Sequence, residues 1–559
     1  MRKKLLSLVL ALAMALSVCA CGNESTNAKT SESQVSKEST VTSETATQPV
    51  EDTGITFPLA EEVTFDVIVP GDGVKLAEIE KVPFWKELYE QTNVKINWIP
   101  VAKDTFMETV NAMFTSGQEG DVILSASVKI KEADLSVMAA NGLLLPLNEY
   151  LDDAELMPNF NERIIAESPQ TKGFITCPDG KIYAAPRYSA LEGSYLESPM
   201  WINKTWLDKL GKKVPATIEE LEEVLTLFAE NDMNGNGADD EIPYIFRPAD
   251  GSAHLEALLG LWGIPTKNGT NENFLYIKNG EVIFAPTQEA YKDYIKTLNR
   301  WYEKGILWSE GFTANKETYT AKVGSTDLIV GMYTYPTPPN NNYDDYVCIT
   351  PVDVKGYETS WYIHPGIQGV KGSVCLTRSC ENADIFMKWL DMWYSFENTI
   401  RIQYGEATDG RYDVVDGKIS PKTLSSDEKK ALNESKPTVA YCLDNGHYPY
   451  CYTSEDYAER MILSETETSK QENYALYKEY LTTEIWPRPY IAAEDSSRIA
   501  ELRTDIFNTV NLKNAAWITG DADIDAEWDA YVQSLNKIGL DEFVKIHQGV
   551  YDVYLESNK

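Results

Sequence analysis

The chain of 559 residues contains few histidines and, after its N-terminus, no long apolar run. The four histidines are far apart and show no metal-ligand spacing, so a catalytic zinc site is not expected. The motifs GxSxG, GxGxxG and the phosphate-binding P-loop are absent. No internal stretch is apolar over the length that spans a membrane. These absences argue against zinc hydrolases, serine hydrolases, nucleotide-dependent enzymes and integral membrane proteins.

Basic residues are scarce relative to acidic ones. The chain has 50 Lys and Arg against 86 Asp and Glu, a formal charge of -36. Such a charge repels nucleic acid and anionic lipid headgroups and keeps a protein in solution. Nucleic acid is therefore not expected as a partner.

The cysteines show no CxxC pair. Two pairs, Cys375 with Cys380 and Cys442 with Cys451, are close enough in sequence to form small disulfide loops outside the cell. Free buried thiols are an equally good interpretation, because a chain of this length needs no covalent staples. The sequence leaves this choice open.

The N-terminus has the features of a secretion signal, with Arg2, Lys3 and Lys4 before the apolar run from Leu5 to Val18. The sequence Val-Cys-Ala-Cys that ends at Cys21 resembles a bacterial lipobox, which implies that Cys21 is lipidated. The alternative is ordinary cleavage after Ala20. Residues 21–58 are rich in Ser and Thr and poor in large apolar residues, so they predict a disordered tether.

Strand and helix patterns alternate after the tether. Val63–Val69, Val94–Ile99 and Asp121–Leu124 predict buried strands, with amphipathic helices between them. This alternation indicates a parallel, doubly wound sheet, in which ligands bind beyond the carboxyl ends of the strands. Asp72 and Ser125 follow two of these strands, so each is either a ligand contact or a turn residue.

The stretch from Asp179 to Leu210 connects a strand, an aromatic loop, a second strand and a helix that Asn203 can cap. Its pattern DGKIYAAP…NKTWLDKLG resembles extracellular solute-binding protein family 1, the sugar-binding lipoproteins of ABC transporters, and in particular its large calcium-loop subgroup. The likeness covers nearly the whole chain after the tether.

The resemblance implies an α/β, two-lobed periplasmic-binding-protein-like fold in which each lobe is a mainly parallel sheet flanked by helices. The first lobe is expected at 59–184 with 363–452, and the second at 185–362 with 453–559. An oligosaccharide would bind between the lobes and pass to an ABC permease. The protein would be a monomer without enzymatic activity, anchored by lipid to the extracellular face of the cytoplasmic membrane.

Two other functions stay open from the sequence alone. The many acidic residues leave room for the carboxylate pair of a polysaccharide-active, glycoside hydrolase-like enzyme, although no acid/base motif stands out. A glycan adhesin without transport is the second alternative.

Residues 232–241 carry the sharpest local motif, DMNGNGADDE. Oxygen-bearing side chains at alternate positions, with glycine at the turn, are typical of a structural calcium loop. The motif starts like an EF-hand, but Pro243 occupies the closing position and a strand follows in place of a helix. A bare Asn/Gly turn is the alternative. The predicted Ca²⁺ ligands are Asp232, Asn234, Asn236, Ala238, Asp240 and Glu241.

Aromatic residues are abundant, with 13 Trp and 32 Tyr. A sugar ring offers an apolar face that stacks on an aromatic ring. Most Trp occur at helical spacing and predict core positions. Others stand beside glycines or at strand ends, where they are predicted either to contact the sugar or to line the lobe interface. This second set is Tyr188, Trp201, Trp262, Tyr333, Tyr335, Trp361 and Tyr404, with Tyr404 chosen by resemblance to a family segment near the cleft.

Overall fold

The computed structural model describes residues 54–71, 73–196, 198–248, 252–266, 273–338, 343–364, 371–444 and 446–557. The predicted signal peptide, Cys21, most of the predicted tether and Asp72 lie outside the described residues. The described chain forms two four-stranded sheets, each packed against its own hydrophobic core.

The sheet of the first lobe has the strand order β11-β3-β1-β2. Strand β1 (Val63–Pro70) pairs in parallel with β2 (Val94–Val101) and β3 (Val122–Leu124), and β11 (Val374–Leu376) runs antiparallel to β3. The three predicted strands are confirmed. Successive β1 side chains are buried on opposite faces, as expected for a sheet covered on both sides, which explains the nearly continuous apolar run.

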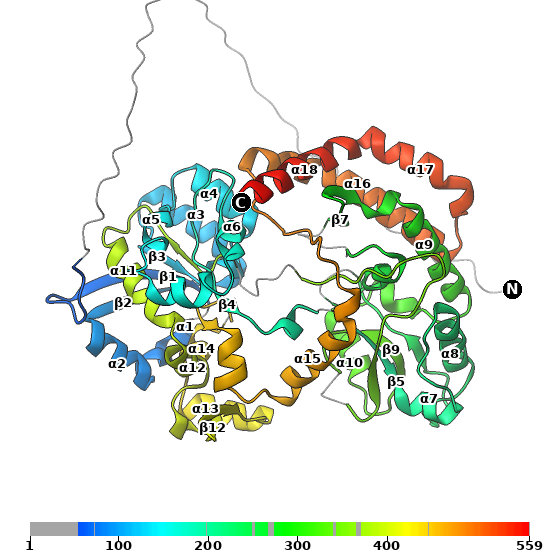
Figure 1. Cartoon of the computed structure of the whole chain (residues 1–559), viewed down its shortest axis with the longest axis horizontal. Coiled ribbons are helices and arrows are strands. Elements are labelled where there is room, and N and C mark those ends of the chain that lie inside the picture. The colour runs from blue at the N-terminus through cyan, green and yellow to red at the C-terminus, as the bar shows by residue number, and fades with distance from the viewer. Residues whose placement is uncertain are drawn as a thin grey trace, which may run out of the picture. The chain divides into compact units, whose positions relative to one another are not determined.

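Helices flank this first sheet, and the parallel strands lie together in the blue to cyan part of Figure 1. All but the helix at Ser426–Ser435 bury apolar side chains in the first-lobe core. The flanking helices are α2 (Pro83–Thr92), α3 (Phe106–Ser116), α4 (Glu132–Ala140), α6 (Gln170–Ile175), α11 (Ala383–Asp391), α12 (Phe396–Tyr404), α13 (Ser426–Ser435) and α14 (Val439–Leu443).

The sheet of the second lobe has the order β10-β5-β9-β6. Strand β9 (Val330–Thr334) pairs in parallel with β6 (Ile242–Tyr244) and antiparallel with β5 (Met200–Asn203), and β10 (Tyr346–Ile349) runs antiparallel to β5. The two-lobed fold is confirmed. The exact lobe boundaries stay a prediction.

The helices of the second lobe bury the larger core. They are α7 (Lys204–Leu210), α8 (Ile218–Glu230), α9 (Glu289–Glu303), α10 (Lys316–Val323), α15 (Glu465–Tyr477), α16 (Ala493–Thr519), α17 (Ile524–Ile538) and α18 (Leu540–Ser557). Side-chain caps begin α7 and α8, the first of them the predicted cap at Asn203. The Asn203 side chain accepts a hydrogen bond from Trp206 N at 3.0 Å at the start of α7, and Thr217 accepts one from Glu220 N at 3.2 Å at the start of α8.

Short strand pairs complete the described chain. Two are antiparallel hairpins, and the third joins the loop after the first sheet to a distant segment in parallel. They are β7 (Leu275–Lys278) with β8 (Glu281–Phe284), β12 (Tyr412–Val415) with β13 (Lys418–Pro421), and β4 (Tyr188–Ser189) with β14 (Cys451–Tyr452).

Two questions left by the sequence are answered for the described residues. The six cysteines there are free thiols, and five of them are buried, so the disulfide alternative is not supported. No helix among the described residues is long and apolar enough to cross a membrane.

Candidate ligand-binding site

A cavity of about 270 Å³ opens beyond the carboxyl end of β3. The chain turns there at Ser125, whose φ of 57° lies in the left-handed region, and enters the short 3-10 helix η3 (Ala126–Val128). Gly372, directly before β11, lines the same cavity. This is the position at which doubly wound sheets bind ligands.

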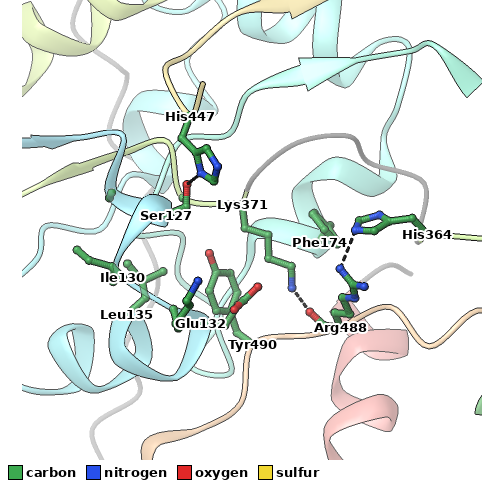
Figure 2. Close-up of a pocket in the computed structure, with 13 residues that line it drawn as sticks. Ser127, Ile130, Glu132, Leu135, Phe174, His364, Lys371, His447, Arg488 and Tyr490 are labelled. Atoms are coloured by element: carbon green, nitrogen blue, oxygen red, sulfur yellow. Dashed lines mark hydrogen bonds between the residues drawn. The ribbon is translucent and has the colours of Figure 1, made fainter. Parts of the chain in front are cut away.

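Lys371 is the central charged group of this first-lobe cavity (Figure 2). Its side chain is buried, with a residue exposure of 6%, and its ammonium lies 4.3 Å from the ring centre of Phe174 and 4.7 Å from that of Tyr490. The ammonium donates a hydrogen bond to the carbonyl oxygen of Arg488. Burial lowers the pKa of Lys371 to about 8, so the cation persists at neutral pH.

Two histidines complete the polar lining. Arg488 Nη1 lies 2.7 Å from His364 Nε2, and the Ser127 hydroxyl lies 3.0 Å from His447 Nδ1 (Figure 2). Burial, followed by the charges of Arg187 and two lysines, lowers the pKa of His447 to about 4. His447 is therefore neutral at physiological pH, and its ring can hydrogen-bond a sugar hydroxyl in either sense.

A second cavity, of about 250 Å³, lies beyond the carboxyl ends of β6 and β9 in the second lobe. The phenol oxygens of Tyr319 and Tyr333 are buried, and neither has a hydrogen-bond partner among the described residues. The Arg247 guanidinium lies 6.0 Å from the ring centre of Tyr319. Tyr335, with 39% exposure, also lines the cavity and presents an accessible ring. This lining suits hydroxyl groups and a sugar face.

The predicted residues fall into different surroundings. Tyr333 and Tyr335 line the second-lobe cavity, as the ligand prediction requires. Ser125 is fully buried directly before the first-lobe cavity, and its hydroxyl has no partner among the described residues. Trp201 is a buried residue of β5 whose Nε1 donates to the Tyr335 carbonyl at 2.8 Å, so it supports the cavity wall from behind.

Tyr188 and Tyr404 belong to the first-lobe side of the molecule. Tyr188 is buried on β4 and joins the first-lobe core. Tyr404 is half-buried and packs against Tyr412, with 6.2 Å between ring centres. It borders an aromatic cluster formed by Tyr448, Tyr450, Tyr452 and Tyr457. Neither residue lines one of the two cavities.

The placement predicted for Trp262 and Trp361 is wrong. Both were expected in loops with no core to fill, yet their exposures are 3% and 1% and both join the second-lobe core. Trp262 ends the 3-10 helix η6 (Leu255–Trp262). A Cβ on Gly260 would lie 2.8 Å from Trp361 Cε3, so this glycine permits close packing.

The sequence interpretation missed the polar lining of the first-lobe cavity. Ser127, His364, Lys371, His447 and Arg488 come from segments far apart in the chain. Single Lys, Arg and His residues in such segments carry no motif. The only local signal was the position of Ser127 just after a predicted strand.

Side-chain oxygens of the loop at 232–241 accept hydrogen bonds from other residues of the same loop. Both carboxylate oxygens of Asp232 accept backbone N–H groups, from Gly235 at 2.6 Å and from Gly237 at 2.9 Å. Glu241 accepts Met233 N at 2.7 Å, which brings the last acid of the motif to its start. Asp240 accepts the side-chain amides of Asn234 and Asn236, both at 3.2 Å. The donor set consists only of oxygens, the ligands that Ca²⁺ prefers, so the loop fits that ion.

The chain is similar over its length to known transport proteins. It is 28% identical over 527 residues to the fructooligosaccharide ABC transporter substrate-binding protein FusA of Streptococcus pneumoniae, a match that covers 90% of this chain and 93% of FusA. It is also 31% identical over 166 residues, 28% of each chain, to the polygalacturonan/rhamnogalacturonan-binding protein YtcQ of Bacillus subtilis.

Solved structures agree with these relatives. The structure of FusA in complex with kestose has a TM-score of 0.71 and 25% identity, covering 88% of this chain and 100% of that one. An EF-hand mutant of FusA in complex with fructo-nystose has a TM-score of 0.70 at 25% identity, with the same coverage. An HMO-binding, ABC-transporter-associated solute-binding protein from Bifidobacterium longum infantis has a TM-score of 0.75 at 25% identity, covering 88% of this chain and 99% of that one.

The family itself follows from a match over more than half of the sequence. The sequence model described as bacterial extracellular solute-binding protein matches residues 73–372. That range contains β2 and β3 of the first sheet, the crossing between the lobes and the whole second sheet. The chain therefore belongs to the family of bacterial extracellular solute-binding proteins, the binding components of ABC transporters.

Proposed function

We propose that this protein captures an oligosaccharide between its two lobes and delivers it to the membrane permease of an ABC importer. The observation that carries the proposal is the similarity to FusA along nearly the full length of both chains, with kestose bound in the solved structure. The relatives differ in the glycan they are named for, fructo-oligosaccharide for FusA and polygalacturonan for YtcQ. They support the class of ligand and leave open the identity of the sugar.

The two cavities supply complementary chemistry for such a ligand. Both lie at carboxyl ends of parallel strands, one in each lobe. The partly exposed ring of Tyr335 offers a stacking face, while Ser127, His447 and the phenols of the second lobe offer hydrogen bonds. Hinge closure of the lobes would bury the sugar between these surfaces. Binding and release need no bond to form or break.

The decisive experiment is a titration of the purified protein with a panel of neutral and acidic oligosaccharides. Calorimetry gives the Kd, thermal melting gives the stabilisation, and chromatography of the same samples reports cleavage. We expect at least one ligand to bind and raise Tm while staying intact. Accumulation of shorter sugars would restore the hydrolase alternative, and binding to no member of the panel would contradict the transport function.

A structural calcium ion is part of the proposed function. Asp232, Asn234, Asn236, Asp240 and Glu241 would hold it with side-chain oxygens, and Ala238 would offer its carbonyl. The similar EF-hand mutant of FusA supports an ion loop of this kind in the family. Because the loop joins α8 to β6, its ion would stabilise the second lobe and take no part in contacting the sugar.

Membrane attachment is proposed to occur through lipid on Cys21. The lipobox-like sequence and the extracellular family support this anchor. Full-length protein made in a bacterium is expected to partition into detergent, whereas Cys21→Ala is expected to stay in the aqueous phase, because multiple acyl chains hold a protein firmly on a bilayer. Equal partitioning of the two forms would contradict lipidation. A monomer is expected, and sedimentation of the soluble variant tests it.

A further inference from the structure

The first-lobe cavity has the opposite charge to the protein as a whole. The chain carries 86 acidic and 50 basic residues, yet the cavity is lined by Lys131, Lys371 and Arg488 and by one acid, Glu132. Basic side chains gathered at a partly buried cavity cost desolvation energy and indicate a local need for positive charge.

Lys371 is the residue at which this need is best defined. Its ammonium is buried, and no carboxylate among the described residues lies within ion-pair distance of it. Two aromatic rings and one carbonyl oxygen are its nearest neighbours, and the charge of Glu132, which lines the same cavity, acts on it from farther away. These groups compensate only part of the hydration that the ammonium loses, because a desolvated charge is stabilised best by an opposite charge.

We propose that this cavity binds an anionic substituent of the ligand, so that the transported oligosaccharide contains an acidic sugar. The inference rests on the proposed function and adds a ligand class to it. A carboxylate on the sugar would approach Lys371 and the nearby Arg488, while Phe174 and Tyr490 exclude water around the charges. Charge-assisted hydrogen bonds in such a site are about twice as strong as neutral ones.

The second-lobe cavity has the same sign. Its lining includes Arg247 and Lys316 and contains no acidic residue among those described. Arg247 is buried beside Tyr319, whereas Lys316 is exposed at the start of α10. A ligand with acidic sugars at both ends would meet positive charge in both lobes.

A purely structural role for Lys371 is the competing explanation. Its contacts to Phe174, Tyr490 and the Arg488 carbonyl connect β11 to the segment that precedes α16. If Lys371 only holds these two segments together, its substitution would lower the stability of the protein equally with every ligand. A binding role would instead change the discrimination between charged and uncharged forms of the same sugar.

The test uses matched pairs that differ only in charge. Uronate oligosaccharides of several linkages are compared with their methyl esters, and sulfated sugars with their desulfated forms, by calorimetry on the intact protein. We expect an acid to bind at least tenfold more tightly than its neutral match. The first pair reveals a carboxylate ligand and the second a sulfate ester. Equal affinity within every pair, or preference for the neutral forms, would overturn the inference.

Substitutions test whether the preference for an acidic sugar arises at the first-lobe cavity. Lys371→Met is expected to cost about tenfold to a hundredfold in affinity for the acid and little for the ester. Glu132→Gln removes the one acidic residue of the cavity without removing a group that Lys371 contacts. It is expected to tighten binding of the acidic sugar alone. Lys86→Met, a matched change at an exposed helix position, is the control. If Glu132→Gln leaves the ratio of acid to ester unchanged, the charge-based site is contradicted even where Lys371→Met fails to fold.

Different results would contradict the acidic ligand and the transport function. Tight binding of a neutral sugar alone would contradict the acidic ligand and keep the transport function. Absence of binding by acidic and neutral sugars alike would contradict both.

Discussion

Both lobes bury tryptophans, but the polar cavity of the first lobe contrasts with the large aromatic core of the second. The first lobe gathers charged and polar side chains from distant segments around a cavity at the end of β3. The second lobe buries its tryptophans in a large core, where Trp262 packs on Tyr294 and Trp361 on Tyr477 with ring centres 5.2 and 5.1 Å apart. Residue type alone therefore does not identify the ligand contacts of this protein.

The glycines beside Trp262 and Trp361 explain why the sequence suggested exposed loops for two residues that lie in the core. In the sequence they look like breaks in structure, which suggested exposed loops. In the fold they allow close approach, because a Cβ on Gly260 would also lie 2.9 Å from the Ser360 carbonyl oxygen, and one on Gly263 would lie 2.8 Å from that of Glu358. A glycine next to a large aromatic residue can mark either a break in structure or a close packing contact, and only the tertiary structure distinguishes the two.

The largest effect that tests this comparison is expected for Trp361→Ala. Removal of a fully buried indole should lower the free energy of unfolding by about 3–5 kcal/mol, because the cavity left behind cannot refill. Chemical denaturation measures the loss. An unchanged denaturation midpoint, with weaker sugar binding, would return Trp361 to the ligand site and break the distinction between the lobes.

Two histidines, the fully buried His547 of the second lobe and the half-buried His447 of the first, offer a comparison by pH. His547 in the second-lobe core is 0% exposed and contacts Trp486 and Phe543, and burial lowers its pKa to about 4. The unfolded chain then binds more protons between about pH 4 and 6.5, so stability rises across this window. The full contribution is about 3 kcal/mol.

His547→Gln is therefore expected to flatten the dependence of stability on pH between 4 and 6.5. His447→Gln in the first-lobe cavity should flatten it less, because that residue is only half-buried and solvent screens its charge. Denaturation at a series of pH values measures both slopes. A larger effect at His447 than at His547 would mean that the cavity desolvates its histidine more strongly than the core does, contrary to this expectation.

The loop at 232–241, which is proposed to bind calcium, is expected to give the next effect. An ion bound only to the native state at a hundredfold excess over its Kd stabilises the protein by about 2.7 kcal/mol. EDTA should lower Tm, and Asp232→Ala should abolish that sensitivity, since Asp232 organises the loop through Gly235 and Gly237. Lys86→Met controls for an exposed charge change. A melt that is insensitive to EDTA, with no metal found by mass spectrometry, would leave the bare turn as the explanation.

The smallest effect on stability is expected at Tyr335. Its ring is partly exposed at the second-lobe cavity, so Tyr335→Ala should change the free energy of unfolding by no more than about 0.5 kcal/mol. Loss of a stacking ring should nevertheless weaken sugar binding about threefold to tenfold. Calorimetry beside a melt separates the two. Unchanged affinity would remove Tyr335 from the site.

Local patterns in the sequence were enough for the elements of the fold. The strands of the first sheet, the Asn203 cap and the capped start of α8 all depend on residues within a few positions of one another, and each is present. The motif at 232–241 is equally local, since its hydrogen bonds join residues no more than eight apart. Its residue types suit calcium, and the ion itself stays a prediction.

The sequence by itself determined which segments form strands and helices, where helices begin, and the family resemblance, because these depend on periodicity and on neighbours along the chain. Only the tertiary structure decided that Trp262 and Trp361 are core residues and that Lys371, His447 and Arg488 share a cavity. The physical reason is that burial and charge are properties of a place in space. A lysine becomes a desolvated cation, and a glycine a packing surface, only when residues hundreds of positions away close around it.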